Sequence, residues 1–260
     1  MSVAANTKWH ELTWEEVGLR VAEGMDTAIL PVGATEQHGP HMGCGMDADI
    51  ARHLCEAVAD QTGAVVLPTL PYGCSIGHSK RWPGTLALQP KTLIDVVKDL
   101  GDWIHASGFR RLFIVNSHVT NAAPLRCALE MLRAEHDGFM IALVNSASIS
   151  ERVRREHFHD AEDWHANGAE TSLMMAVSPQ MVREEKLAES DDEDRTTDSV
   201  FAHPVNRTST NGVTGKPSLA SKAKGEQLFQ WMVEDLSEMV RKGMREESPL
   251  NVSYHETLEF

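Results

Sequence analysis

Short apolar runs alternate with segments of helical periodicity over the first part of the chain, and this alternation restricts the fold more than any other feature. A crossover of helix length between two short strands is the connection that parallel strands require. The alternation therefore predicts an α/β fold, a single domain with a mostly parallel sheet flanked by helices on both faces. The expected strands are residues 27–32, 64–67, 112–115 and 139–144, and the expected helices between them are 49–61, 93–108 and 125–135.

One domain spanning residues 1–260 accounts for the whole chain, since 260 residues with 42% hydrophobic content fit one large α/β domain. Further helices are expected over 9–22, with Thr13 as its cap, over 169–177 and over 219–242. Residues 184–217 form an irregular, acidic segment within the domain. Its most acidic part, Glu184 to Asp198, is expected to be a solvated or mobile surface.

The loop that follows the first expected strand is rich in metal-ligand side chains. Glu36 and His38 lie two residues apart, so both point to the same side if the segment is extended. Glycine and proline residues then bend the loop, which can return Asp47 to the same point. A lone Glu-x-His pair would more often be a polar loop. Here three ligands follow a buried strand, and this placement favours a metal site.

Two later segments bring further ligand types to the same edge of the predicted sheet. His118 follows the third expected strand, and Glu170 lies near the start of the helix over 169–177. Ligands gather beyond the carboxyl ends of the strands in such sheets. Taken alone, His118 could be a hydrogen-bonded histidine at a strand end. Glu170 alone could be a favourable charge in a first helical turn.

Four blocks of the sequence form an ordered pattern: Pro31 to His41 with Met46-Asp47, Trp82 to Thr85, Asn116 to Asn121 and His165 to Ser172. Together they resemble the creatininase family of metal-dependent amidohydrolases. This resemblance implies two divalent ions per chain, zinc and/or manganese, held by nitrogen and oxygen ligands. One ion would be bound by Glu36 and His118 and the other by His38 and Glu170, with Asp47 bridging them.

The resemblance also suggests residues around the metals. His165 is expected to act in catalysis by transferring a proton while a tetrahedral intermediate collapses. A surface histidine in a charged segment is the alternative. Four further side chains are expected to bind substrate, although packing would explain each of them equally well. These are His41, His78, Trp82 and Trp164.

The implied function is hydrolysis of the C–N bond of a small cyclic amide by a water activated between two metal ions. Creatininases carry an acidic residue two places after the histidine of the third block, and Thr120 stands there instead. Creatinine itself is therefore not implied as the substrate. The alternatives are a hydrolase that opens the ring of a sugar- or inositol-derived cyclic ketone of the 3-dehydro-inosose type, and a non-catalytic, metal-stabilised subunit.

Several classes of function are excluded by composition and motif. The net charge of −14 argues against nucleic-acid binding, and no apolar run is long enough to span a membrane. The start of the chain has no signal-peptide pattern, and four cysteines without a C-x-x-C pair suggest the reducing cytoplasm. Motifs for a serine nucleophile or a phosphate-binding loop do not occur. The expected partners are a small-molecule substrate and copies of the chain itself, as a hexamer by family resemblance.

Overall fold

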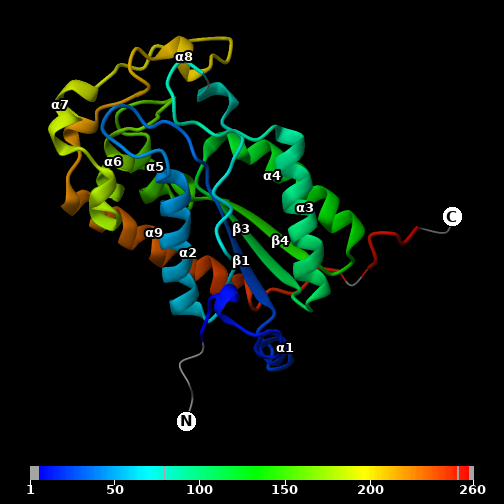
Figure 1. Ribbon diagram of the computed structural model, residues 1–260. Helices are drawn as coiled ribbons and strands as arrows, with labels where there is room; N and C mark the ends of the chain where they lie inside the picture. The colour runs from blue at the N-terminus through cyan, green and yellow to red at the C-terminus, as the bar shows by residue number, and fades with distance from the viewer. Residues whose placement is uncertain (1–5, 79, 251, 258–260) are drawn as a thin grey trace.

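Four parallel strands form the centre of the computed structural model, which describes residues 6–257 except 79 and 251. Their order in the sheet is β2-β1-β3-β4, and helices cover both faces (Figure 1). Every pairing in the sheet is parallel. The predicted α/β fold with a parallel sheet is confirmed. The strands are β1 (Thr27–Val32), β2 (Val65–Val66), β3 (Arg111–Asn116) and β4 (Met140–Asn145).

The two faces of the sheet are covered by different helices. On one face lies α2 (Met46–Thr62) beside the last helix, α9 (Lys222–Gly243), with α6 (Gly168–Val177) packed against α9. The other face is covered by α3 (Pro90–Ala106) and α4 (Ala122–Glu135). The shorter helices are α1 (Trp14–Ala22), α5 (Glu151–His157), α7 (Leu187–Ser190) and α8 (Val205–Thr208). Turns of 3-10 helix are η1 (Trp9–Glu11), η2 (Ile76–His78), η3 (Val119–Asn121), η4 (Ser146–Ser148), η5 (Pro179–Met181), η6 (Glu184–Lys186) and η7 (Pro217–Leu219).

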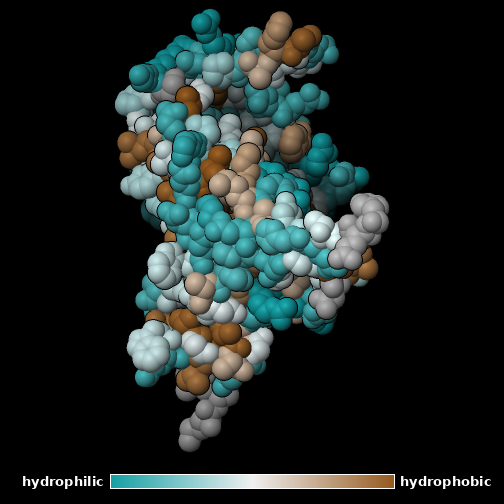
Figure 2. Space-filling model, turned by 90° about the vertical axis from the view of Figure 1, so that its right-hand side faces the viewer, coloured by the Kyte–Doolittle hydropathy of each residue, from teal (hydrophilic) through white to brown (hydrophobic). Residues whose placement is uncertain are grey.

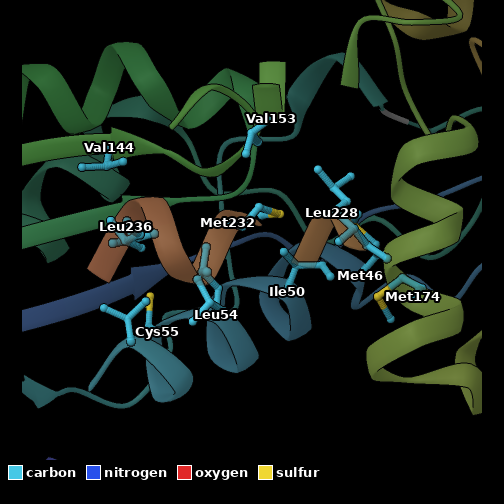
Figure 3. Packing of buried hydrophobic residues seen from close by; sticks show 14 of the residues in the cluster. Met46, Ile50, Leu54, Cys55, Val144, Val153, Met174, Leu228, Met232 and Leu236 are labelled. Atoms are coloured by element: carbon cyan, nitrogen blue, oxygen red, sulfur yellow. The ribbon is translucent and has the colours of Figure 1, made fainter. Parts of the chain in front are cut away.

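The period of two along the strands divides the core into two layers. Ile29 of β1 belongs to the layer beneath α2 and α9, whereas its neighbours Ala28 and Leu30 belong to the layer beneath α3 and α4. Figure 3 shows the first layer, where Leu54 of α2 lies close to Met232 of α9. All six residues of β1 and of β3 are buried, as expected for a parallel sheet covered on both faces.

The start of α2 differs from the prediction in a way that matters for the site. This helix begins at Met46 rather than at residue 49, so Asp47 lies in its first turn and not on the preceding loop. Gly33, just after β1, permits this arrangement. A Cβ on Gly33 would lie 2.4 Å from the Cα of Ala48, so only glycine allows the helix to start this close to the end of the strand.

Other element boundaries depart from the prediction in smaller ways. The segment 9–22 is a 3-10 turn followed by α1, because Thr13 and Glu16 form a capping box that starts the helix at Trp14. The strand β2 has only two residues, and α5 was not expected.

The acidic segment 184–217 folds back over the carboxyl edge of the sheet in the same chain. Most of its acidic side chains, such as Glu184, Glu185 and Glu193, are exposed, as expected for a solvated surface. Asp192 is the exception: it is buried and accepts hydrogen bonds from Ser209 and Thr210. Near the end of the segment, Thr214 pairs with His165 through both backbone groups. In Figure 1 this segment, with α7 and α8, occupies the upper part of the view. None of the helices seen among the described residues has the length and apolar character needed to cross a membrane.

Candidate metal centre

The five predicted metal ligands converge at the carboxyl edge of the sheet. Glu36 and His38 lie on the segment after β1, Asp47 in the first turn of α2, His118 just after β3, and Glu170 in the first turn of α6. All five are at least 95% buried. Carboxylates are rarely buried this completely without a partner, so the arrangement points to a shared counter-charge.

The nitrogen and oxygen atoms of these side chains face one another at short range. The Nδ1 atom of His118 lies 3.3 Å from Glu36 Oε1 and 3.4 Å from Asp47 Oδ2. The Nε2 atom of His38 lies 3.4 Å from Asp47 Oδ1. Asp47 thus turns one oxygen toward each histidine, which is the geometry of a bridging carboxylate. Ligand atoms within 4.8 Å of one another form three groups: Glu36 with His38 and His165; Glu36 with His78 and His118; and His38 with Asp47 and Glu170.

Several of these buried atoms have no hydrogen-bond partner among the described residues. They are both Glu36 carboxylate oxygens, His38 Nε2, Asp47 Oδ2 and His78 Nδ1. Leaving such atoms unpaired costs roughly 1–3 kcal/mol each, and more for charged groups. Because they point at one another, a cation between them would satisfy them together.

In each of three histidines, the outer ring nitrogen faces a backbone carbonyl and the inner ring nitrogen faces the carboxylates of the centre. His38 Nδ1 lies 3.2 Å from the carbonyl oxygen of Glu36, and His165 Nε2 lies 2.8 Å from that of Gln37. His118 Nε2 lies 3.3 Å from the carbonyl oxygen of Cys74. A carbonyl only accepts, so each outer nitrogen carries the proton. The inner nitrogen, which faces the carboxylates, is then the one available to a metal ion, as in metal-binding histidines.

The electrostatics of the centre reflect the buried carboxylates. Burial, helped by the neighbouring Asp47 carboxylate and opposed by His38, raises the pKa of Glu170 to about 7. Burial lowers the pKa of His38, but the carboxylates of Asp47 and Glu170 outweigh burial and raise it to about 10. Burial likewise opposes ionisation of Glu36, yet His118 and His78 hold its pKa well below the usual range. The centre therefore favours positive charge strongly.

His78, predicted to bind substrate, lies among the ligands. Its Nδ1 atom is 3.6 Å from Glu36 Oε1, and it forms a ligand-sized group with Glu36 and His118. It comes from η2, within the long loop after β2. Its sequence position gave no sign of ligand geometry, because only the fold of that loop brings it to the sheet edge.

The other predicted substrate residues are placed differently. Trp164 lines the cavity above the metal ligands. His41 is fully buried, with its Nε2 atom 2.9 Å from Thr171 Oγ1, and lines neither of the two cavities at the centre. Trp82 also lines neither cavity and packs beneath the guanidinium of Arg81, whose Cζ atom is 4.8 Å from the ring centroid.

Two adjoining cavities open beside the ligands. The first, of about 240 Å³, is lined by Glu36, Asp47, His78, His118, His165 and Glu170 and by others at its mouth. Five of its described lining residues carry carboxylates and none is lysine or arginine. The second cavity, of about 160 Å³, shares His118, Trp164 and Glu170 with the first. The first cavity therefore suits cations and neutral molecules better than anions.

A strained residue holds Glu170 in place. Ala166 has a φ of +53°, which is uncommon for a residue other than glycine. Its backbone N–H donates to Glu170 Oε2 over 2.6 Å. The next residue, Asn167, caps α6 by accepting the backbone N–H of Glu170. The unusual backbone thus fixes one carboxylate oxygen of Glu170, and such strain is found mainly at functional sites.

The chain is similar to several known proteins. Residues 10–240 match the family model of creatininase, creatinine amidohydrolase. The chain is 31% identical to creatinine amidohydrolase of Pseudomonas putida, over 89% of this chain and 95% of that protein. It is 30% identical to the mycofactocin precursor peptide peptidase of Mycobacterium ulcerans (strain Agy99), over 80% of this chain and 81% of that protein. A solved manganese form of creatininase superposes with a TM-score of 0.80 at 30% identity, covering 93% of this chain and all of that one. Another solved creatininase, a mutant, is of a Zn–Zn type.

Proposed function

This chain belongs to the creatininase family of metal-dependent hydrolases, and from that premise we propose that it opens a small cyclic amide at its C–N bond. The observation that carries the proposal is the set of unpaired lone pairs on Glu36, His38, Asp47 and His78, which face one another inside the protein. A structural polar cluster would have paired these atoms with each other or with the backbone.

We assign the ligands in two groups joined by Asp47. Glu36, His78 and His118 form the first group, and His38 and Glu170 form the second. His78 takes the place of the acidic residue that creatininases carry where Thr120 stands. Thr120 instead accepts a hydrogen bond from His118 Nε2 over 2.5 Å while its hydroxyl donates to the carbonyl of Cys74. It thereby orients a ligand without being one.

When bound, two divalent ions would polarise the amide carbonyl and make a water acidic enough to act as nucleophile near neutral pH. Asp47 would hold the two groups at a fixed separation, because its two oxygens are directed to different histidines. The rigid turn at Ala166 would keep Glu170 from swinging away. The burial of the ligands excludes bulk water, which strengthens each of these electrostatic interactions.

His165 is the residue we assign to proton transfer. Its Nε2 proton is committed to the Gln37 carbonyl, and its Nδ1 atom lies 3.7 Å from Glu36 Oε1 at the floor of the cavity. Burial lowers the pKa of His165 well below the usual range, which keeps the ring neutral and leaves a lone pair on Nδ1. In the proposed reaction, Nδ1 would take a proton from the attacking water and return it to the leaving amide nitrogen.

Metal analysis combined with a substrate panel tests this function. Protein purified without chelator is expected to hold close to two zinc or manganese ions per chain. It should hydrolyse at least one of creatinine, hydantoin, dihydrouracil or a γ-lactam, and chelation should abolish the activity. Short peptides should be tested for peptidase activity, which is the activity named for the mycofactocin relatives. Cyclic polyols with one ketone should be tested for ring opening at a C–C bond. Full metal content without turnover of any compound would instead identify a non-catalytic, metal-stabilised subunit.

The His165→Ala variant tests the assigned role of that residue. It is expected to keep both ions and lower kcat by on the order of a hundredfold, with KM nearly unchanged. Loss of one ion in this variant would make His165 a ligand instead, since it also groups with Glu36 and His38.

Association into a homo-oligomer, a hexamer by family resemblance, remains a prediction for light scattering. One feature supports it. Figure 2 shows apolar surface at the lower end of the molecule, the level at which α1 lies in Figure 1, and α1 exposes Trp14 and Leu19. Exposed apolar side chains on one helix suit a contact with another copy.

A further inference from the structure

The second cavity adjoins the first beside the metal ligands. It lies beyond the carboxyl ends of β3 and β4, beneath α5, and we call it the inner chamber. Six residues line both cavities: Ser117, His118, Val119, Phe158, Trp164 and Glu170. A molecule whose reacting bond lies at the metal ligands can therefore extend into the inner chamber without leaving the site.

Small side chains create the space of the inner chamber. Ser146, Ala147 and Ser148 follow β4, and Ala122 faces them from the start of α4. The floor is apolar, with Ile50 and other side chains of the core. At about 160 Å³ the chamber is close in size to engineered apolar cavities of roughly 150 Å³ that bind benzene. It would hold a six-membered ring or a branched group of four to six carbons.

One buried polar group without a hydrogen-bond partner in the described part of the chain lines the chamber, beside other polar side chains such as Asn116 and Ser146. His157, at the end of α5, is 3% exposed, and both of its ring nitrogens lack a hydrogen-bond partner among the described residues. Its ring centroid lies 5.2 Å from that of Trp164 at a tilt of 39°, which fixes the plane of the imidazole. A buried imidazole offers one donor and one acceptor, and leaving both unused is costly unless a ligand uses them.

The chamber also excludes charged groups. Its only ionisable lining residues are Glu170 and His118, which we assign to the metals, and His157. No lysine, arginine or aspartate lines it among the described residues. A charged substituent would lose its hydration there without gaining a counter-ion.

We propose that the inner chamber is a substrate subsite for an uncharged, mainly apolar substituent that carries one hydrogen-bonding group, which His157 recognises. The substrate class is then an amide with a ring-sized or branched substituent next to the scissile bond, larger than an unsubstituted small ring. The inference rests on the proposed function only in placing the scissile bond at the metal ligands.

Binding of phenol and toluene to the metal-loaded protein tests the chamber directly, without any turnover. Saturation-transfer NMR is expected to show saturable binding of both, with phenol preferred. Ala147→Leu should lower the affinity for both probes by at least tenfold, because the larger side chain fills the chamber. Ala122→Leu should lower both affinities for the same reason. Ala123→Leu is the matched control. Ala123 is exposed on the next residue of α4 and lines neither cavity, so its variant should bind like the wild type.

His157→Phe separates recognition from volume. Phenylalanine keeps an aromatic ring beside Trp164 and removes both nitrogens, so toluene should still bind while the preference for phenol disappears. An unchanged preference for phenol would remove His157 from the proposal. Failure of wild-type protein to bind either probe saturably would overturn the subsite altogether.

A kinetic comparison connects the chamber to catalysis. 5-Benzylhydantoin is expected to have a higher kcat/KM than hydantoin by tenfold or more. Ala147→Leu should bring the ratio of the two kcat/KM values close to one, whereas Ala123→Leu should preserve it. If no hydantoin is turned over but the probes still bind and Ala147→Leu still blocks them, the proposed function fails and the subsite stands. If both hydantoins are turned over equally and Ala147→Leu changes neither, the function stands and the subsite is rejected.

Discussion

Charged side chains are buried at both ends of the central sheet, but at one end they are hydrogen-bonded and at the other several of their atoms have no hydrogen-bond partner among the described residues. At the amino end, Arg111 begins β3, and its Nη1 donates to both oxygens of Asp26 over 2.8 and 2.6 Å. Its Nε donates to the carbonyl of Gly243 and its Nη2 to that of Glu246, at 3.1 and 3.0 Å. Each guanidinium nitrogen has a partner, so this charge is satisfied by the protein alone.

At the carboxyl end the protein leaves its charges unsatisfied. Glu36, Asp47 and His38 point lone pairs at one another, and several of these atoms have no donor among the described residues. The comparison teaches how to distinguish the two uses of a buried polar cluster. A cluster with complementary donors and acceptors stabilises the fold. A cluster of facing acceptors requires something from outside, which we propose to be metal ions.

The largest effect is expected from removing the bridging charge at the carboxyl end. Asp47→Asn replaces one bridging oxygen by an amide nitrogen, which cannot bind a cation. We expect loss of tight binding of both ions and a fall in turnover on the order of a thousandfold, equivalent to about 4 kcal/mol. Elemental analysis and kcat/KM measure this. Retention of two ions with near-normal turnover would contradict the assignment of Asp47.

The same chemical change at the amino end is expected to affect stability alone. Asp26→Asn leaves Arg111 buried without its carboxylate, and such a loss costs about 3 kcal/mol. Urea unfolding should show this destabilisation, while metal content and kcat stay as in the wild type. Added zinc should raise the melting temperature of Asp26→Asn but not that of Asp47→Asn, because only a folded state that binds metal gains from it. Loss of metal from Asp26→Asn would break the contrast between the two ends.

A more modest effect is expected at the residue that orients His118. Thr120→Val keeps the branched shape and removes the hydroxyl that accepts from His118 Nε2. Metal affinity should fall by roughly 10- to 100-fold, as is usual for residues that support a ligand. Competition with a chelator of known affinity measures the change. The neighbouring Val119→Thr is the control, since Val119 is 62% exposed. Equal affinities for the two variants would show that Thr120 has no orienting role.

The smallest effect concerns His157, which is buried like the ligands but faces no carboxylate. Burial lowers its pKa from the usual 6.5 to about 4 in the folded protein. Between pH 6.5 and pH 4, His157 is therefore protonated in the unfolded chain but stays neutral in the folded protein. The contribution of His157 to stability is present above pH 6.5 and is lost as pH falls toward 4. From pH 7 to pH 5 the loss should be about 1–2 kcal/mol.

Comparison with His157→Phe isolates this contribution. Both proteins should be unfolded with urea in the presence of chelator, so that proton competition at the metal ligands does not enter. The wild type is expected to lose more stability than His157→Phe between pH 7 and pH 5. Parallel pH dependences would show that the folded protein protonates His157 as easily as the unfolded chain does.

Local periodicity was sufficient to predict much of the fold. The expected strand over residues 27–32 is β1, and β3 and β4 were predicted to within one residue at each end. Apolar runs identify buried strands because both faces of a parallel sheet are covered. The placement of Glu36, His38 and His118 beyond strand ends followed from the same pattern, since parallel strands all end at one edge.

The set of elements and the edge at which ligands gather thus follow from local sequence patterns. How the ligands meet depends on the packing of distant segments. The approach of α2 to the end of β1 at Gly33 places Asp47 in a helix, and the path of the loop after β2 brings His78 to Glu36. The inner chamber depends on side chains from α2, α4, α5 and the end of β4 together. Periodicity records which face of an element is buried, but contacts between distant segments depend on packing that no short stretch of sequence encodes.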